Sequence, residues 1–95
     1  MIISNDNKIP ALYSQEEAKD LLVYVSVKIG QAFWLLTEFD PEKKIAFGWA
    51  ELFAGGGELG YISIKELEEA VDNYGGQIVN YKEPIPLSKL KRKFQ

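Results

Sequence analysis

The chain of 95 residues contains no cysteine and no histidine. The lack of cysteine excludes disulfides and thiolate nucleophiles, and the lack of histidine excludes imidazole bases and triads built on histidine. The usual zinc ligands are missing as well. No window approaches the roughly 18 consecutive apolar residues that a membrane-spanning helix needs, and the N-terminal residues do not resemble a secretory signal. We therefore expect a cytoplasmic protein with no membrane contact, no cofactor and no resident metal, and a binding protein in preference to an enzyme.

Charge is distributed unevenly along the chain. Residues 1–81 carry 13 acidic and 6 basic side chains, whereas residues 82–95 carry 5 basic side chains and 1 acidic one. Such a basic cluster is a candidate contact for nucleic acid or another anionic surface. Its members are Lys89, Lys91, Arg92 and Lys93. Because the acidic body would repel a polyanion, a solvated tail is the favoured interpretation.

The length and composition predict a single domain over residues 1–95, since 46% hydrophobic and 26% charged residues are typical of globular chains. We expect residues 1–8 to form a loose N-terminus. Prolines at positions 84 and 86 predict an extended approach to residues 88–95, which we expect to form a short basic helix or tail.

Three segments have the pattern of strands. Apolar residues alternate over 21–29, and a second apolar run over 32–39 is followed by turn residues at 40–44. The chain then returns over 45–52, which completes a hairpin. Small and large residues alternate in this last strand, so the small side leaves room for a helix. The small residues are Ala46, Gly48 and Ala50, and the large ones are Ile45, Phe47 and Trp49.

The strongest helix signal covers residues 63–74. Ser63 and Glu66 form a capping box, apolar residues follow at helical spacing, and two glycines end the helix. A shorter helix is expected near Ser14, and a last strand over 77–81. The predicted fold is α+β: a small antiparallel sheet of three or four strands with one main helix on one face and short helices near the termini.

Residues 55–60 read G-G-G-E-L-G and match the dinucleotide-binding pattern G-x-G-x-x-G. That pattern works only where the glycine turn itself opens a helix, so that backbone N–H groups meet the pyrophosphate. The predicted helix begins only at Ser63, and Glu58 would place a negative charge in the phosphate site. We therefore predict a connecting loop.

Two further sets of side chains are candidates for chemistry or contact. Four carboxylates could converge on a divalent cation, although their spacing does not fix whether they do. They are Glu38, Asp40, Glu51 and Glu58. Trp49 and Tyr61 are candidate contacts for a partner or for bases, while the aromatic residues as a set are more typical of a core.

Several short motifs together resemble one bacterial family, catalogued as domain of unknown function 2958. They are I-P-x-L-Y (9–13), T-E-F-D-P-E (37–42), F-G (47–48), E-L-G-Y-I-S-x-x-E-L (58–67) and P-x-P-L-S (84–88). The resemblance covers about residues 9–91. It implies a small protein of the kind carried on plasmids, phages and conjugative elements, and it implies no reaction and no catalytic residues.

These observations favour a non-enzymatic binding or accessory protein of a mobile genetic element that acts through a protein partner. Three alternatives remain open. A nucleic-acid-binding module would need a continuous basic surface that joins the tail to Lys43 and Lys44. A metal-dependent hydrolase would need at least three converging carboxylates, and an acidic DNA mimic would need carboxylates spaced like phosphates. The sequence leaves the oligomeric state open.

Overall fold

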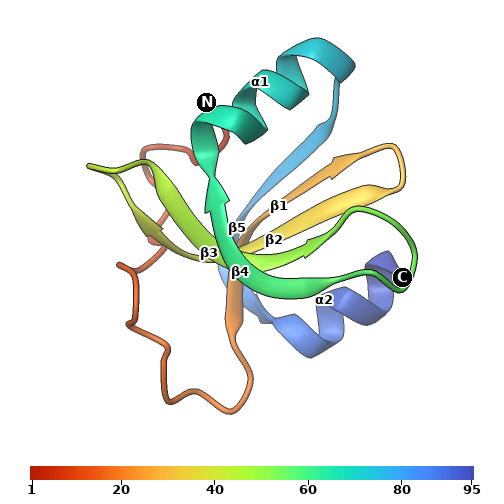
Figure 1. Ribbon diagram of the computed structural model, residues 1–95. Coiled ribbons are helices and arrows are strands. Elements are labelled where there is room, and N and C mark those ends of the chain that lie inside the picture. The colour runs from red at the N-terminus through yellow and green to blue at the C-terminus, as the bar shows by residue number, and fades with distance from the viewer.

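The computed structural model describes residues 1–95 and contains one antiparallel sheet and two helices (Figure 1). The strands pair in the order β4-β3-β2-β1-β5, so β4 and β5 are the two outer strands. In chain order the elements are β1 (Leu22–Ile29), β2 (Ala32–Asp40), β3 (Ile45–Glu51), β4 (Glu58–Ser63), α1 (Ile64–Tyr74), β5 (Gln77–Pro86) and α2 (Leu87–Phe94).

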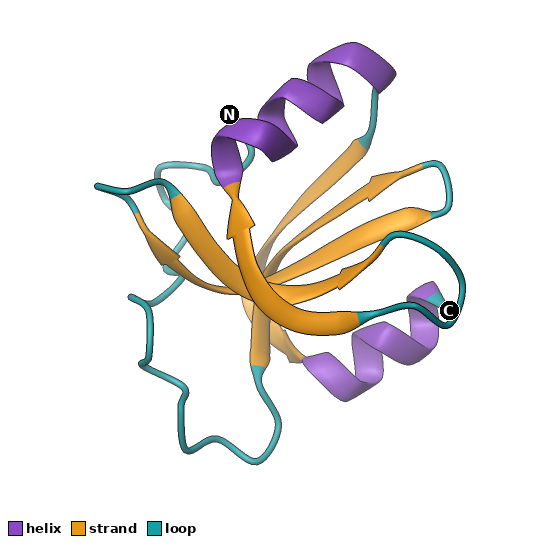
Figure 2. Ribbon diagram, in the orientation of Figure 1, coloured by secondary structure: helices purple, strands orange, loops and turns teal.

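The predicted fold class was wrong in its balance of sheet and helix. The sheet has five strands instead of three or four, and the two helices lie on opposite sides of it instead of one main helix covering a small sheet (Figure 2). Residues 58–63 form a strand, although the sequence predicted a connecting loop over 55–60, and β5 continues beyond the predicted 77–81 to Pro86. Both are outer strands, and β5 tolerates its prolines because an outer strand pairs on one side only.

The first face of the sheet is covered by α1 together with the N-terminal residues. Ile64 and Leu67 of α1 pack in one buried cluster with Ile2 and Ile3. We expected residues 1–8 to be loose, but the structure attaches them firmly. The Asn80 side chain accepts from the backbone N–H of Ser4 at 3.0 Å and donates to the carbonyl oxygen of Ile2 at 3.0 Å, so the segment has both apolar and polar anchors.

The second face is covered by α2. Leu87 and Leu90 are buried against Val23, Phe33 and Leu35 in a separate cluster. The Phe33 and Phe94 rings also meet, with centroids 5.2 Å apart. The short basic C-terminal segment is thus a docked helix, and its apolar side holds it on the sheet.

The start of α1 follows the predicted cap, whereas the helix expected near Ser14 does not form. The Ser63 hydroxyl accepts from the backbone N–H of Glu66 at 3.2 Å, and α1 begins at the next residue, Ile64. Around Ser14 the chain makes only turns. The Ser14 hydroxyl donates to the carbonyl oxygen of Ala11 at 2.6 Å instead of capping a helix.

Gly48 allows β3 to approach β2 closely. A Cβ atom at this position would overlap with the backbone carbonyl oxygen of Leu35, and the pairing of β2 with β3 shifts by one residue between Leu36 and Glu38. The sheet bends at this irregularity. The small side of β3 therefore serves strand packing as well as helix packing, since Ala46 lies in the cluster that α1 covers.

None of the helices is both long enough and apolar enough to cross a membrane.

Candidate functional site: a cleft between the 11–21 loop and α2

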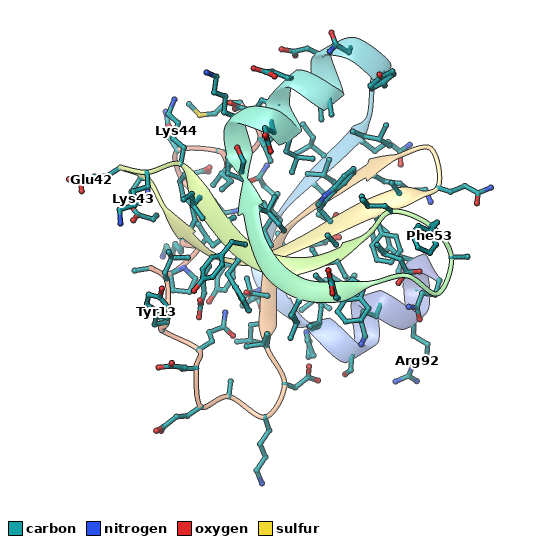
Figure 3. The ribbon with its side chains drawn as sticks, viewed as in Figure 1. Tyr13, Glu42, Lys43, Lys44, Phe53 and Arg92 are labelled. Atoms are coloured by element: carbon teal, nitrogen blue, oxygen red, sulfur yellow. The ribbon has the colours of Figure 1, made fainter.

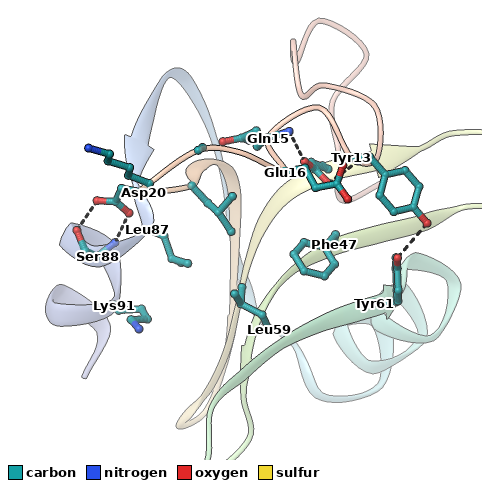
Figure 4. A pocket seen from close by; sticks show the side chains of 14 residues that line it. Tyr13, Gln15, Glu16, Asp20, Phe47, Leu59, Tyr61, Leu87, Ser88 and Lys91 are labelled. Carbon is teal, nitrogen blue, oxygen red and sulfur yellow. Dashed lines mark hydrogen bonds between the residues drawn. The ribbon is translucent and has the colours of Figure 1, made fainter.

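A cleft of about 550 Å³ opens on the face of the sheet that α2 covers (Figure 4). This volume lies within the range of roughly 300–1,000 Å³ that is typical of binding sites. Its floor consists of Phe47 from β3 together with Leu59 and Tyr61 from β4. The 11–21 loop forms one wall and the start of α2 the other.

Strand pairing places the floor side chains together. Phe47 pairs with Tyr61, and Trp49 pairs with Leu59, so all four side chains lie on the same side of the sheet. The Phe47 and Tyr61 rings meet edge to face, with centroids 5.4 Å apart. Leu59 is nevertheless 46% exposed and Tyr61 is 61% exposed, so the floor presents apolar and aromatic surface to solvent.

Glu38 holds the loop wall in place. Its carboxylate accepts from the backbone N–H groups of Tyr13 and Gln15, at 2.8 and 2.7 Å, and its side chain is only 4% exposed. The Gln15 side chain extends the attachment, because its amide nitrogen donates to the carbonyl oxygens of Leu22 and Thr37 and its oxygen accepts from the Leu22 N–H. These bonds fix the loop against β1 and β2.

Tyr13 joins the loop wall to the floor. Its backbone has a positive φ of 72°, which is uncommon for a residue other than glycine. Its hydroxyl lies 3.0 Å from that of Tyr61 and the two share a hydrogen bond. This bond, with the nearby negative charge of Glu16, raises the pKa of Tyr61 above its ordinary value of 10.0. The Tyr61 phenol therefore remains protonated near neutral pH.

Asp20 joins the loop wall to α2. Its carboxylate accepts from the Ser88 hydroxyl at 2.6 Å and from the Ser88 backbone N–H at 3.2 Å. The hydroxyl bond is the main reason that the pKa of Asp20 lies below its ordinary value of 3.8. No side chain at the helix boundary itself caps α2, so Asp20 supplies the acceptor from a distant part of the chain.

Trp49, Lys91 and Glu51 interact at the α2 end of the cleft. The Lys91 ammonium lies 3.9 Å from the centre of the Trp49 ring, and the Trp49 indole donates to Glu51 at 3.2 Å. Gln95 also donates to Glu51, at 2.8 Å, and this bond is the largest cause of the lowered pKa of Glu51. Lys91 and Trp49 thus already contact each other within the protein.

The basic residues predicted as nucleic-acid contacts do not form one surface with the hairpin lysines. Lys89, Arg92 and Lys93 are exposed on α2, away from its buried leucines. Lys43 and Lys44 lie in the turn between β2 and β3, at the other end of the molecule from Arg92 (Figure 3). Of the predicted contacts, only Tyr61, Trp49 and Lys91 share the side of the sheet that forms the cleft.

The four candidate carboxylates do not converge. Glu38 binds the loop, and Asp40 accepts from the backbone N–H groups of Glu42 and Lys43 in the hairpin turn. Glu51 lies at the far end of β3, where it binds Trp49 and Gln95. No group of three or more acidic residues in the protein is placed to hold a metal ion.

The glycine motif connects two antiparallel strands. Gly55 to Gly57 lie between β3 and β4, and the rest of the motif is part of β4, so no helix starts at its last glycine. Gly57 has a packing role that the sequence did not reveal, because a Cβ atom there would overlap with the Trp49 ring. The geometry required for a dinucleotide phosphate site is therefore absent.

The sequence interpretation overlooked the loop wall of the cleft and two of its three floor residues, Phe47 and Leu59. Gln15 gave no signal and Glu38 was named only as a candidate metal ligand, since their roles in the wall depend on contacts between distant segments. Leu59 did carry a signal: Leu59 and Tyr61 are two apolar residues two positions apart, as in a strand. Gly60 between them is atypical of a strand interior, so the alternation was not recognised.

Comparison with known proteins gives a family and no function. The family model described as "Protein of unknown function (DUF2958)" matches residues 4–91. No curated protein and no solved structure matches the chain. Because the family model covers nearly all of the sequence, the chain belongs to the DUF2958 family.

Proposed function

We propose that this member of the DUF2958 family is a non-enzymatic binding protein that acts through a protein partner, and that the partner binds at the cleft. The observation that carries the proposal is the exposure of Leu59 and Tyr61, at 46% and 61%, on a floor whose backbone is fixed by strand pairing. Exposed apolar side chains gathered in a concave site mark interaction surfaces. Tyrosine is also enriched in protein–protein interfaces.

The chemistry of the cleft supports binding over catalysis. The carboxylates of Glu38 and Asp20 accept hydrogen bonds from the protein's own backbone and from Ser88. The phenols of Tyr13 and Tyr61 bond to each other, and the pKa of Tyr61 is raised. Each of these groups serves to fix the walls. The surface left for a partner is therefore apolar and aromatic on the floor, with the charged side chains of Glu16, Lys19 and Lys91 at the walls.

The biological setting is part of the proposal. The family resemblance supports an accessory role in a bacterial mobile genetic element, and we place the partner in the cytoplasm. Neither point is needed for the binding site itself, which depends only on the geometry of the cleft.

A nucleic-acid role is the weaker candidate. It is favoured by the three exposed cations of α2, namely Lys89, Arg92 and Lys93. The hairpin lysines lie at the other end of the molecule, and residues 1–81 are acidic, which would oppose a polyanion (Figure 3). Fluorescence anisotropy with DNA and RNA at physiological salt should show no binding in the micromolar range. Tight binding that is lost when these three residues are neutralised would favour the nucleic-acid module instead.

A selection from a random peptide library displayed on phage tests the proposed function. We expect enriched peptides whose affinity falls by about tenfold or more with Leu59→Lys, because a charge would replace an apolar contact. Tyr74→Lys is the matched control, since Tyr74 is an exposed aromatic residue of α1 outside the cleft. If no peptide is enriched, or if both substitutions weaken binding equally, the cleft is not the binding site.

A further inference from the structure

The outer strand β4 has backbone groups that no strand uses. The N–H of Ile64 donates to the carbonyl oxygen of Lys44 at 3.0 Å, which continues the pairing of β3 with β4. In an antiparallel pair, bonded and non-bonded positions alternate. Ile62 and Gly60 are therefore bonded to β3 as well, whereas the N–H and C=O groups of Leu59 and Tyr61 point away from it.

The free backbone groups and the cleft floor belong to the same two residues. The side chains of Leu59 and Tyr61 face the cleft, and their backbone groups face the open side of β4. An extended peptide alongside β4 would thus gain main-chain hydrogen bonds, while every second side chain of the peptide would lie on the cleft side of the extended sheet. One peptide segment can therefore bind the free backbone groups of β4 and the cleft floor at the same time.

The opposite edge of the sheet does not offer this surface. Pro84 and Pro86 in β5 have no N–H to donate, and the pairing of β5 with β1 is irregular between Val23 and Val25. Proline and irregular pairing both prevent the addition of strands. Strand β4 has neither, since it pairs regularly with β3 along its length and contains no proline.

The charges beside β4 favour a basic partner segment. Glu16 lines the cleft near Tyr61, where its charge contributes to the raised pKa of that phenol, and Glu58 is exposed at the start of β4. Two ammonium groups line the cleft, those of Lys19 and Lys91, against the three carboxylates of Glu16, Asp20 and Glu38. With Glu58 added, the charge beside β4 is net negative, in keeping with the acidic composition of residues 1–81.

We infer that β4 binds an extended, positively charged segment of a protein partner as an additional strand, with every second, apolar side chain of that segment directed to the cleft floor. The inference rests on the proposed function and specifies the kind of partner. The net negative charge beside β4 argues against a second copy of this chain, because two copies joined along β4 would bring two negatively charged surfaces together.

The probe is the tightest-binding peptide from the phage selection, made synthetically and methylated at one backbone nitrogen at a time. Strand addition predicts alternation: methylation at every second residue lowers affinity by about tenfold or more, and methylation at the residues between has little effect. The probe should also carry basic residues, and its affinity should fall with rising salt. Loss of affinity without alternation would overturn strand addition.

Two substitutions at Tyr61 test the protein side of the same contact. Tyr61→Ala removes the side chain and keeps the outward N–H, while Tyr61→Pro removes both and leaves the hydrogen bonds of Gly60 and Ile62 to β3 in place. We expect the proline variant to bind the probe about tenfold more weakly than the alanine variant, with both folded by circular dichroism. If Tyr61→Pro does not fold, the methylation series decides alone.

The outcomes separate the two proposals. A probe that needs Leu59 but shows no alternation, with equal binding to the two Tyr61 variants, leaves the protein-binding cleft intact and overturns strand addition. Failure to select any peptide that depends on Leu59 overturns both. If sedimentation shows that the free protein is a dimer and Tyr61→Pro makes it monomeric, β4 pairs with a second copy, and the inferred partner is wrong.

Discussion

The two outer strands of the sheet differ in how they meet solvent. Strand β5 contains two prolines, pairs irregularly with β1 and is tied to the N-terminal segment through Asn80. Strand β4 pairs regularly with β3, contains no proline and carries the exposed side chains of Leu59 and Tyr61. Proteins commonly block outer strands that would otherwise pair with other chains. An edge left open beside a cleft is therefore where this protein is most able to bind a partner.

The inner strand β3 and the outer strand β4 predict effects of different size at two glycines that pair with each other, Gly48 and Gly60. Gly48→Ala should lower the free energy of unfolding by about 3 kcal/mol, because the new methyl group would overlap with the backbone carbonyl of Leu35. Gly60→Ala should change it by less than about 0.5 kcal/mol, since no atom lies near its Cβ position. Urea denaturation of both variants checks this difference. Equal effects would contradict the packing described for β3.

The attachment of the 11–21 loop to the sheet should depend on Glu38. Glu38→Ala should cost about 2 kcal/mol of stability, because two backbone N–H groups lose a charged acceptor in a nearly buried position. The amide protons of Tyr13 and Gln15 should then exchange faster with solvent. Glu58→Ala is the matched control, an exposed glutamate on β4 whose loss should have little effect. Unchanged exchange at Tyr13 and Gln15 would show that Glu38 does not hold the loop.

The stability of the junction between β4 and α1 should depend on the Ser63 cap. Ser63→Ala should cost about 1 kcal/mol, since the N–H of Glu66 loses its acceptor where β4 passes into α1. Ser63→Asp keeps an acceptor and should retain most of the stability. Equal denaturation midpoints for the wild type and Ser63→Ala would count against this cap.

Removal of the contact between Asp20 and α2 should have the smallest effect on stability, and this effect should be detectable only at acidic pH. Hydrogen bonds from Ser88 hold the pKa of Asp20 below 3.8, so this contribution is fully present above about pH 4 and is lost as the pH falls through the lower folded value. Between about pH 6 and pH 3 the melting temperature of Asp20→Asn should therefore fall less than that of the wild type. Parallel melting curves for the two proteins would contradict this linkage.

The sequence predicted the parts of the fold that local chemistry controls. Alternation and turn residues located β1, β2 and β3, and the capping box located the start of α1 within one residue. Strand β4 was missed because Gly60 interrupts its pattern, and only the first half of β5 was predicted, over 77–81, because prolines interrupt the rest. Pairing with a neighbouring strand overrides these preferences, and that pairing is set by residues far away in the chain.

The site was less predictable than the fold. Tyr61, Trp49 and Lys91 were named in advance as contacts, and the structure places them on one side of the sheet. The helix expected near Ser14 was wrong: the chain makes turns there, and Glu38, more than twenty positions away, holds them through the N–H groups of Tyr13 and Gln15. The walls of the cleft consist of such long-range hydrogen bonds, for which a single sequence carries no periodic signal.

Hydrogen exchange of the free protein, followed residue by residue with NMR, tests most directly whether the β4 edge is open. The account predicts alternation along β4: slow exchange at Gly60 and Ile62, whose N–H groups bond to β3, and fast exchange at Leu59, Tyr61 and Ser63. Equally slow exchange at all five residues would mean that the outer side of β4 is already paired or covered. That result would contradict the open edge on which the comparison of β4 with β5 depends.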